Sequence, residues 1–360
     1  MNFLFAGGGT GGHVFPALAI ADELKKMDSS SDILFVGAKG KIEERLVPQN
    51  GYRLETISIE GLKRNLSLSN FSLVFKLVRS VIKSKKIIKE FNPQVVIGTG
   101  GFVSLPVLYS ATSMKKKTLI QEGNYYPGLT TKFLAPKVNK VVVNFEGTKE
   151  LLKRKDNIIK IGHPIRSALK ISDPQEAKIK LGISLDKFTV LVFGGSQGAR
   201  GINNAIGSLV EEFLKNEINL IWQTGKSDFG ELSGKFANKE NVLIQDFFND
   251  MGLVYSAADL VVCRSGITSI MELASLRKAV IFIPFPDATD NHQESNAKSL
   301  EAEGAAFIIL QKDVAKGLFP LILELKNNKS KLNDLEKNIK KFEDTKAAKK
   351  IADVIMNLSV

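Results

Sequence analysis

Short runs of apolar and β-branched residues alternate with longer amphipathic stretches from one end of the chain to the other. Apolar runs of about four to six residues between turn formers are typical of buried strands, and a period near 3.6 is typical of helices. The alternation predicts an α/β protein with parallel sheets and crossover helices. The predicted strands are 2–6, 33–37, 54–59, 95–99, 118–121 and 141–145, then 189–193, 220–223, 242–245, 260–263, 280–283 and 306–309.

These strands fall into two series of about six, which indicates two domains. A length of 360 residues agrees, because one domain usually takes about 100 to 200 residues. We expect two doubly wound, Rossmann-like domains, at 1–163 and 164–340. Near the junction, Asp173 can cap a short helix that Pro174 begins and Gly182 ends.

The end of the chain predicts one more helix, at about 344–358. Asp344 can cap it, and an apolar stripe at helical spacing follows. The stripe consists of Ala347, Ile351, Val354, Ile355 and Leu358. We therefore expect this helix to dock on a domain surface.

Charge distinguishes one region from the rest. The 50 Lys and Arg residues and 38 Asp and Glu residues give a net charge of +12. Residues 51–160 hold 20 basic and 7 acidic residues, so this region carries +13 and the remainder −1. A basic surface suits nucleic acid, anionic lipid or a phosphorylated substrate; the alternative is a solvated lysine-rich face.

The single cysteine, Cys263, excludes an internal disulfide framework and a cysteine-based zinc site. The N-terminus has no basic region followed by a long apolar run, as a secretory signal would. Nowhere do 18 apolar residues follow one another, so no transmembrane helix is expected. These features predict a cytoplasmic protein.

Two glycine-rich loops each follow a predicted strand and open a predicted helix, at 7–13 and 194–201. Backbone N–H groups at such a helix start favour an anion, whereas the alternative is a turn needed only for tight packing. Gly7, Gly9 and Gly12 fit GxGxxG, but no acidic residue ends the second strand, as NAD binding requires, and no Gly-Lys-Ser/Thr follows. One loop per domain predicts a ligand cleft between the domains.

The polar residues near these loops suggest acid–base and sugar chemistry without a metal. His13, His163 and His292 lie beside turn formers, in no HxxxH, HExxH or DxD pattern, so we expect no metal or cofactor. Each histidine can also be merely structural. Glu272 follows a strand and a small-residue turn, where a carboxylate can accept from a ribose diol, or it is a plain capping or surface acid.

Seven segments between residues 3 and 310 stand out, and they are GGGTGGHVFPALAIA, GTGGFVSLPVL, QEGNYYPGLTTKFLA, GHPIR, FGGSQGARGIN, CRSGITSIMELA and DNHQESNA. In order and spacing these segments resemble the MurG family of peptidoglycan N-acetylglucosaminyltransferases, which belong to glycosyltransferase family 28. The resemblance implies the GT-B fold, two Rossmann-like domains facing across a cleft, with the C-terminal helix packing back on the first domain.

The resemblance also implies an activity. Such hexosyltransferases transfer GlcNAc from UDP-GlcNAc to the C4 hydroxyl of MurNAc in lipid I, with inversion, which gives lipid II. No nucleic acid partner is implied, and the location is peripheral, on the cytoplasmic face of the cell membrane. The alternatives are another GT-B enzyme that uses a UDP-sugar, such as a glycolipid transferase or a UDP-GlcNAc epimerase, and a nucleic-acid-binding protein. The latter would need an aromatic-interleaved basic motif, which is missing.

Site residues are carried over by the same resemblance. In the second domain, Ser196 would meet the diphosphate, Phe248 the uracil through its backbone, and Gln293 the GlcNAc hydroxyls. The nucleoside and diphosphate would lie against Ile267, Thr268, Ser269, Ile270, Met271 and Glu272, with Glu272 on the ribose. In the first domain the donor sugar or acceptor diphosphate would meet Thr10, Gly11, Gly12, Asn124 and Arg166, and His13 is the candidate base. This sequence departs from the family at His163, where Asn is usual, at Gly123 and at His292.

A lipid-linked acceptor implies a membrane-facing surface, and residues 70–91 offer one. Phe71, Val74, Phe75, Val78, Val81 and Ile82 recur at helical spacing, with Lys76, Arg79, Lys83 and Lys86 on a neighbouring face. This helix and the preceding loop, 61–69, are expected to touch anionic lipid. The alternative is a core helix with a solvated lysine edge.

Overall fold

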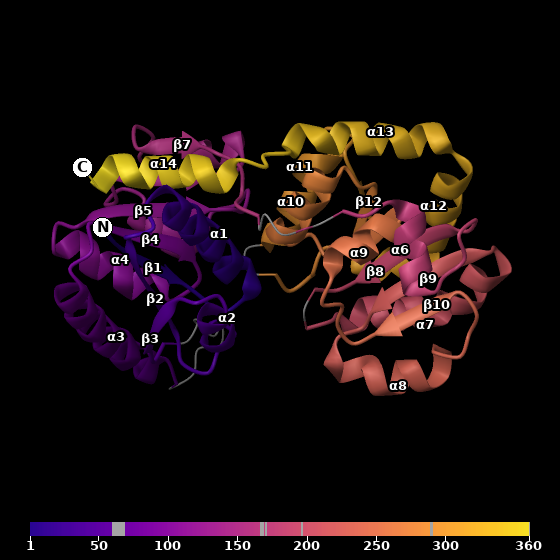
Figure 1. Ribbon diagram of the computed structural model, residues 1–360, viewed down its shortest axis with the longest axis horizontal. Helices are drawn as coiled ribbons and strands as arrows, with labels where there is room; N and C mark the ends of the chain where they lie inside the picture. The colour runs from indigo at the N-terminus through magenta and orange to yellow at the C-terminus, as the bar shows by residue number, and fades with distance from the viewer. Residues whose placement is uncertain (60–68, 166–168, 170, 196, 289–290, 360) are drawn as a thin grey trace. The chain divides into compact units, whose positions relative to one another are not determined.

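In the computed structural model, the chain is described at residues 1–59, 69–165, 169, 171–195, 197–288 and 291–359, with the backbone alone at 69–74. It divides into two compact units. The first unit is Met1–Ser167 together with Asp344–Val360, and the second is Ala168–Glu343 (Figure 1). Among the described residues, no helix is long and apolar enough to cross a bilayer.

The first unit is built on a parallel sheet of seven strands in the order β3-β2-β1-β4-β5-β6-β7. The strands are β1 (Asn2–Gly7), β2 (Asp32–Ala38), β3 (Arg53–Ile57), β4 (Val95–Gly100), β5 (Lys117–Glu122), β6 (Lys140–Val143) and β7 (Ile158–Lys160). All six strands of the first predicted series are present, within a few residues at their ends. The seventh, β7, was missed because three residues show no periodicity.

Helices cover both faces of this sheet. The helices are α1 (Gly11–Met27), α2 (Glu43–Gln49), α3 (Ser69–Phe91), α4 (Ser104–Ser113), α5 (Leu129–Leu134), α14 (Ala347–Ser359) and the 3-10 turn η1 (Glu146–Leu151). Leu4 and Ala6 of β1 pack with α3, α4 and α5, whereas Phe3 and Phe5 pack with α1, α2 and α14. Successive strand residues thus face opposite helix layers, which produces two separate cores and confirms the doubly wound prediction.

The second unit has a parallel sheet of six strands in the order β10-β9-β8-β11-β12-β13. The strands are β8 (Phe188–Phe193), β9 (Ile218–Gln223), β10 (Val242–Gln245), β11 (Leu260–Cys263), β12 (Val280–Phe282) and β13 (Phe307–Ile308), as the second series predicted. The helices are α6 (Pro174–Leu181), α7 (Arg200–Lys215), α8 (Lys226–Phe236), α9 (Met251–Ala257), α10 (Ile267–Leu276), α11 (His292–Glu301), α12 (Val314–Asn327) and α13 (Lys329–Ile339), with short 3-10 turns η3 (Gln311–Asp313) and η4 (Lys340–Phe342).

The predicted ends of α6 are confirmed. The Asp173 carboxylate accepts hydrogen bonds from the backbone N–H groups of Gln175 and Glu176, and Pro174 is the first helical residue. Gly182 ends the helix at φ +68°, in the left-handed region that glycine enters without strain. Local sequence chemistry alone therefore determines where this helix begins and ends.

The C-terminal helix α14 belongs to the first unit and packs against α1. Ala347, Ile351 and Ile355 are fully buried, so the predicted stripe is the docking face. The carboxylate of Asp344 accepts from the N–H groups of Lys346 and Gly162, which joins the start of this helix to the segment after β7. Figure 1 shows α14 in yellow beside β7.

Candidate active site

The glycine-rich loop of the first unit lies where the strand order reverses. Strands β1 and β4 are neighbours, although α1, β2, α2, β3 and α3 separate them along the chain, and Gly7 pairs with Gly100 at their carboxyl ends. In doubly wound sheets this reversal opens a crevice at the carboxyl edge, which is the usual place for a ligand. The sequence-predicted loop therefore stands at the position where the fold favours binding.

His13 is held against the second glycine segment, Thr99–Gly101. Its Nδ1 lies 3.1 Å from the carbonyl oxygen of Thr99, and the Thr99 hydroxyl donates to the His13 carbonyl at 2.8 Å. A carbonyl oxygen only accepts, so this contact makes Nδ1 the protonated nitrogen and leaves the lone pair of a neutral ring on Nε2. A Cβ at Gly100 would lie 2.4 Å from His13 Nδ1, which explains the glycine.

The residues before His13 form the start of α1. Thr10 is exposed and precedes the helix in extended conformation, with no side-chain cap bond, and Gly11 and Gly12 are the first helical residues. The N–H of Gly9 donates to the carboxylate of Glu43, at 3.1 Å from each oxygen, so this donor is engaged inside the unit.

Asn124 follows β5, two residues beyond the buried carboxylate of Glu122. Glu122 accepts from the Asn124 backbone N–H at 3.0 Å and from Asn124 Nδ2 at 3.3 Å. It also accepts from Gly128 N–H and from the Thr131 hydroxyl. One carboxylate thus shapes the loop that presents Asn124, beside the β4 loop in the sheet order.

His163 is 2% exposed, and its Nδ1 lies 3.1 Å from Nε2 of Gln121. Burial, with a smaller contribution from the charge of His13, lowers the pKa of His163 to about 3. His163 is therefore neutral at physiological pH and accepts the amide hydrogen through Nδ1. Arg166, which the resemblance implied for this pocket, lies outside the described residues.

The second unit repeats the arrangement. Its sheet reverses between β8 and β11, and the loops 194–199 and 264–266 follow these two strands. A Cβ at Gly198, whose φ is +78°, would lie 2.0 Å from the Thr224 carbonyl, so only glycine allows the loop to lie against the segment after β9. Ser196 lies outside the described residues.

Helix α10 carries the sequence-predicted nucleoside segment. Ile267, Ile270 and Met271 are buried against the unit, whereas Glu272 is partly exposed. Thr268 Oγ1 is buried with no hydrogen-bond partner among the described residues. Ser269 is partly exposed one turn before Glu272. The Tyr255 hydroxyl of α9 donates to Oε2 of Glu272 at 3.1 Å.

Two glutamines organise the loops beside α10. The side chain of Gln223 accepts from the Phe248 N–H at 2.9 Å, so this backbone donor is already engaged inside the unit. The Gln293 side chain accepts from the N–H of Phe285, and its carbonyl accepts from the Ser265 hydroxyl. The predicted residues Phe248 and Gln293 are thus both tied to the carboxyl edge of this sheet.

Arg264 connects the same loops. Its guanidinium donates to the carbonyls of Ile283 and Pro284, and it lies 5.3 Å from the Phe285 ring centroid. Burial lowers its pKa to about 10, so the side chain remains charged at neutral pH. Arg264 therefore fixes the start of the 284–291 segment against the β11 turn.

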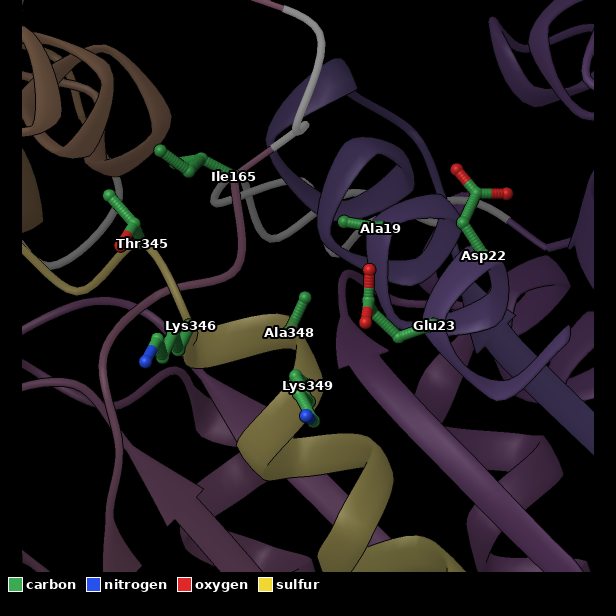
Figure 2. A pocket seen from close by; sticks show the side chains of 8 residues that line it. All are labelled: Ala19, Asp22, Glu23, Ile165, Thr345, Lys346, Ala348 and Lys349. Carbon is green, nitrogen blue, oxygen red and sulfur yellow. The ribbon is translucent and has the colours of Figure 1, made fainter. Parts of the chain in front are cut away.

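Two pockets of the first unit lie away from these loops. One, of about 160 Å³, lies between α1 and the start of α14, with Asp22 and Glu23 on one side and Lys346 and Lys349 on the other (Figure 2). The other, a groove of about 830 Å³, follows the edge strand β3. Neither contains a residue predicted for the substrate site, although Lys83 and Lys86 of the predicted membrane face line the groove. Across the described ranges, no three His, Cys, Asp or Glu side chains gather as metal ligands would.

Sequence reasoning missed the side chains that hold the site residues in place. Each contacts a loop or site residue through a hydrogen bond, and they are Glu43, Glu122, Gln223, Tyr255 and Arg264. Glu43, Gln223, Tyr255 and Arg264 lie 17 to 34 positions from the groups they contact, so no local motif marks these contacts. Glu122 and Arg264 lie inside the segments QEGNYYPGLTTKFLA and CRSGITSIMELA, although neither was predicted as a site residue.

Family models match both units. The glycosyltransferase family 28 N-terminal domain matches residues 3–143, and the family 28 C-terminal domain matches residues 189–353. A curated relative from Flavobacterium psychrophilum is 44% identical over 99% of this chain and 97% of its own length. One from Ruminiclostridium cellulolyticum is 39% identical over 99% of this chain and its own full length. Both carry the name UDP-N-acetylglucosamine--N-acetylmuramyl-(pentapeptide) pyrophosphoryl-undecaprenol N-acetylglucosamine transferase.

Solved structures agree on the fold. The crystal structure of Acinetobacter baumannii MurG has a TM-score of 0.76 and 26% identity, covering 99% of both chains. A UDP-GlcNAc 2-epimerase from Neisseria meningitidis, bound to UDP-GlcNAc, has a TM-score of 0.70 at 14% identity over 99% of this chain and all of its own, which is a likeness of fold alone.

The two sheets, each with its glycine loop at the reversal point, together with these matches, define a glycosyltransferase of family 28 with the GT-B fold. Within it, the chain belongs to the MurG family of N-acetylglucosaminyltransferases. The predictions of fold class and of family are confirmed.

Proposed function

We propose that the protein transfers GlcNAc from UDP-GlcNAc to the C4 hydroxyl of MurNAc in lipid I, forming lipid II for peptidoglycan. The observation that carries the proposal is the match, over nearly the full chain, to relatives that bear this transferase name. The switch-point loops support it, because one unit can take the acceptor and the other the nucleotide sugar. The epimerase alternative rests on a likeness of fold at 14% identity, which is too distant to assign a reaction.

His13 is the proposed general base. The contact between Nδ1 and the Thr99 carbonyl orients the imidazole so that Nε2 carries the lone pair. In the reaction the C4 oxygen attacks the anomeric carbon of GlcNAc, Nε2 takes the hydroxyl proton, and the bond to UDP breaks with its electron pair going to the diphosphate. A positioned base contributes about 10²–10⁴-fold. We place Thr10, Gly11, Gly12, Asn124 and Arg166 around the acceptor and donor sugar.

The second unit is the proposed UDP-GlcNAc site. Glu272 accepts from the ribose hydroxyls, the start of α10 and Ser196 face the diphosphate, and Gln293 contacts the sugar. Support comes from Gly266, the residue before α10, and from the helix start itself, since a helix N-terminus stabilises a departing diphosphate. The proposed uracil contact of Phe248 uses its backbone carbonyl, because Gln223 already engages its N–H.

The decisive assay incubates the protein with UDP-GlcNAc and a short-chain lipid I analogue and measures a β-1,4-linked disaccharide. Glu272→Ala is expected to weaken UDP binding, whereas His13→Ala is expected chiefly to lower kcat. A folded, UDP-binding protein that forms no disaccharide would contradict the proposed acceptor. The opposite pattern in the two variants would reverse the proposed roles of Glu272 and His13.

We further propose that α3 lies on the anionic cytoplasmic surface of the cell membrane. Phe75, Val78 and Ile82 are 63%, 51% and 63% exposed, so these residues do not belong to a core face. Arg79 lies over the Phe75 ring, at 5.6 Å, and Lys86 is exposed on the next turns. The buried face is instead Leu77, Ser80, Ser84, Ile87 and Ile88. Phe71, Val74 and the 61–68 loop lie outside the described side chains.

Helices α4 and α5 extend this surface. α4 packs beside α3 and α5 beside α4, and they expose Tyr109, Leu129 and Phe133. Lys137 lies 4.1 Å from the centroid of Phe133 and 5.5 Å from that of Tyr109. Apolar side chains flanked by cations are what an anionic interface binds.

Vesicle binding tests the membrane proposal. A Lys76/Arg79/Lys83/Lys86→Glu variant is expected to bind phosphatidylglycerol vesicles more weakly, because each nearby cation adds about 1 kcal/mol. Two of these cations already have partners: the Lys83 amine donates to the Thr56 carbonyl at 2.6 Å, and the Lys86 amine lies 3.7 Å from the Glu90 carboxylate. The matched control reverses the charge of two lysines on α13 in the second unit, Lys329 and Lys337, by the same substitution to glutamate. Equal vesicle binding by the α3 variant and the parent would rule the proposal out.

A further inference from the structure

Glu43 is a fully buried carboxylate that none of the proposed chemistry uses. It is the first residue of α2, and its side chain turns back across the carboxyl edge of the sheet. Oε1 accepts from the N–H of Ala38 at 2.8 Å, and both carboxylate oxygens lie 3.1 Å from the N–H of Gly9. A buried charge is expensive to desolvate and is usually retained where it satisfies several donors.

The carboxylate joins two strands at their ends. Ala38 is the last residue of β2, and Gly9 lies two residues beyond β1, at φ +87°. Glu43 therefore holds the glycine loop to the neighbouring strand. It occupies the kind of place at a glycine-rich loop where other proteins bind a phosphate.

Two glycines leave room for the Glu43 side chain. A Cβ at Gly8 would lie 2.0 Å from Oε1 of Glu43, and a Cβ at Gly37 would lie 2.4 Å from its Cγ. Neither glycine has a positive φ, so conformational freedom does not account for them. The Glu43 side chain thus takes the space that a Cβ at Gly8 or Gly37 would need.

Gly9 lies four residues before His13, the proposed base. The next carbonyl, that of Thr10, accepts from the N–H groups of His13 and Val14 and so begins α1. We infer that Glu43 is a positioning residue: by binding the Gly9 N–H it sets the start of α1, and with it Thr10 and His13, in the geometry needed for transfer. This inference rests on the proposed transferase function.

Three variants test it in the disaccharide assay. Glu43→Ala is expected to lower kcat about tenfold to a hundredfold, since a displacement near 1 Å costs about that much. Its affinity for UDP is expected to stay within about twofold, because that site is proposed in the other unit. Glu43→Gln is expected to recover kcat to within about threefold, because an amide oxygen at Oε1 still accepts from Gly9 and Ala38. Glu44→Ala, an exposed neighbour on α2, is the matched control and should change nothing.

A second variant tests the same inference without removing the Glu43 carboxylate. Gly37→Ala should displace Glu43 and lower kcat as Glu43→Ala does, and the double variant should lose no more than either single one. Unchanged kcat in a folded Glu43→Ala protein, a Gln variant as poor as the Ala variant, or additive losses in the double variant would each overturn the inference.

Backbone amide exchange provides a readout that does not depend on the substrate. Glu43→Ala should speed exchange at Gly9 and Ala38 at least about tenfold relative to the parent, while Glu44→Ala should not. If the parent forms no disaccharide, the proposed function fails, and exchange still decides whether Glu43 holds the loop. Unchanged exchange at both amides would overturn the positioning role.

Discussion

The hydroxyl of Tyr255 donates a hydrogen bond to Oε2 of Glu272 at 3.1 Å, from the last turn of α9 to the middle of α10. Tyr255 is fully buried, and its ring meets that of Phe193 edge-on, with centroids 6.0 Å apart. Burial, reinforced by the charge of Glu272, raises the pKa of Tyr255 well above its usual value. The phenol therefore stays a donor, and it fixes one oxygen of the proposed ribose anchor.

Removing this hydroxyl is expected to weaken UDP binding. Tyr255→Phe keeps the packing and loses one hydrogen bond to a carboxylate, worth about 1.5 kcal/mol, so Kd for UDP should rise about tenfold. Calorimetric titration with UDP measures this. The increase should be the same at pH 6.5 and 8.5, because Tyr255 stays protonated. Tyr109→Phe, on the first unit, is the control. An unchanged Kd for UDP in Tyr255→Phe would show that Glu272 does not need the hydrogen bond from Tyr255.

The Glu122 carboxylate is expected to be necessary for acceptor use. Glu122→Ala frees the two Asn124 donors, the Gly128 N–H and the Thr131 hydroxyl, whose bond is 2.7 Å long. We expect kcat/KM for the lipid I analogue to fall by more than about tenfold. KM for UDP-GlcNAc should change little. Steady-state kinetics with each substrate varied in turn separates the two effects.

Glu146→Ala, an exposed carboxylate on η1 of the same unit, is the control for that measurement. A Glu122→Ala enzyme that loses affinity only for UDP-GlcNAc would show that the Asn124 loop serves the donor. Equal kinetics in parent and variant would show that the loop needs no carboxylate.

Acid is expected to destabilise the first unit through His163. The pKa of His163 is lowered by burial to about 3 in the folded protein, against 6.5 as its ordinary value, so the unfolded chain binds the proton more readily. The contribution of neutral His163 to the free energy of unfolding is therefore complete above about pH 6.5. It is lost as the pH falls from there toward 3, by at most about 1.4 kcal/mol per pH unit.

Urea titrations followed by circular dichroism at several pH values between 4 and 7 measure this slope. His163→Asn, which keeps an acceptor for Gln121 Nε2, should flatten the slope, while His292→Asn in the second unit should not affect the first unit's transition. Identical slopes in parent and His163→Asn would mean that other groups cause the acid sensitivity.

The N-cap of α6 is expected to stabilise the second unit. Asp173→Ala leaves the N–H groups of Gln175 and Glu176 without their acceptor, at a cost of about 1 kcal/mol. Trp222, the single tryptophan, is fully buried in this unit, so its fluorescence in urea reports the unfolding. Asp173→Ser should retain most of the stability, and Asp186→Ala, an exposed neighbour, should have no effect. A smaller loss in Asp173→Ala than in Asp186→Ala would contradict the capping role.

The strands could be predicted because both sheets are parallel and buried on both faces. Such strands are continuous apolar runs, as in Phe188–Phe193, and the glycine loops that follow them are just as visible. The short strand β7 had no such signal. In helix α3 the apolar residues did not show which face is buried, because an apolar stripe is compatible with a buried face and with an exposed one. Only the packing in the structure shows that Ile87 is buried and Ile82 is exposed.

The sequence by itself determined the alternation of strands and helices, the ends of α6, the docking stripe of α14 and the two glycine loops, because each depends on residues within a few positions of one another. Only the tertiary structure decided what supports those loops. The bond from Gly9 to Glu43 spans 34 positions, and that from Phe248 to Gln223 spans 25. Such contacts arise because parallel strands bring segments that are distant in the sequence to one edge of the sheet. The buried N–H donors at this edge require acceptors, and no local sequence pattern predicts which residues supply them.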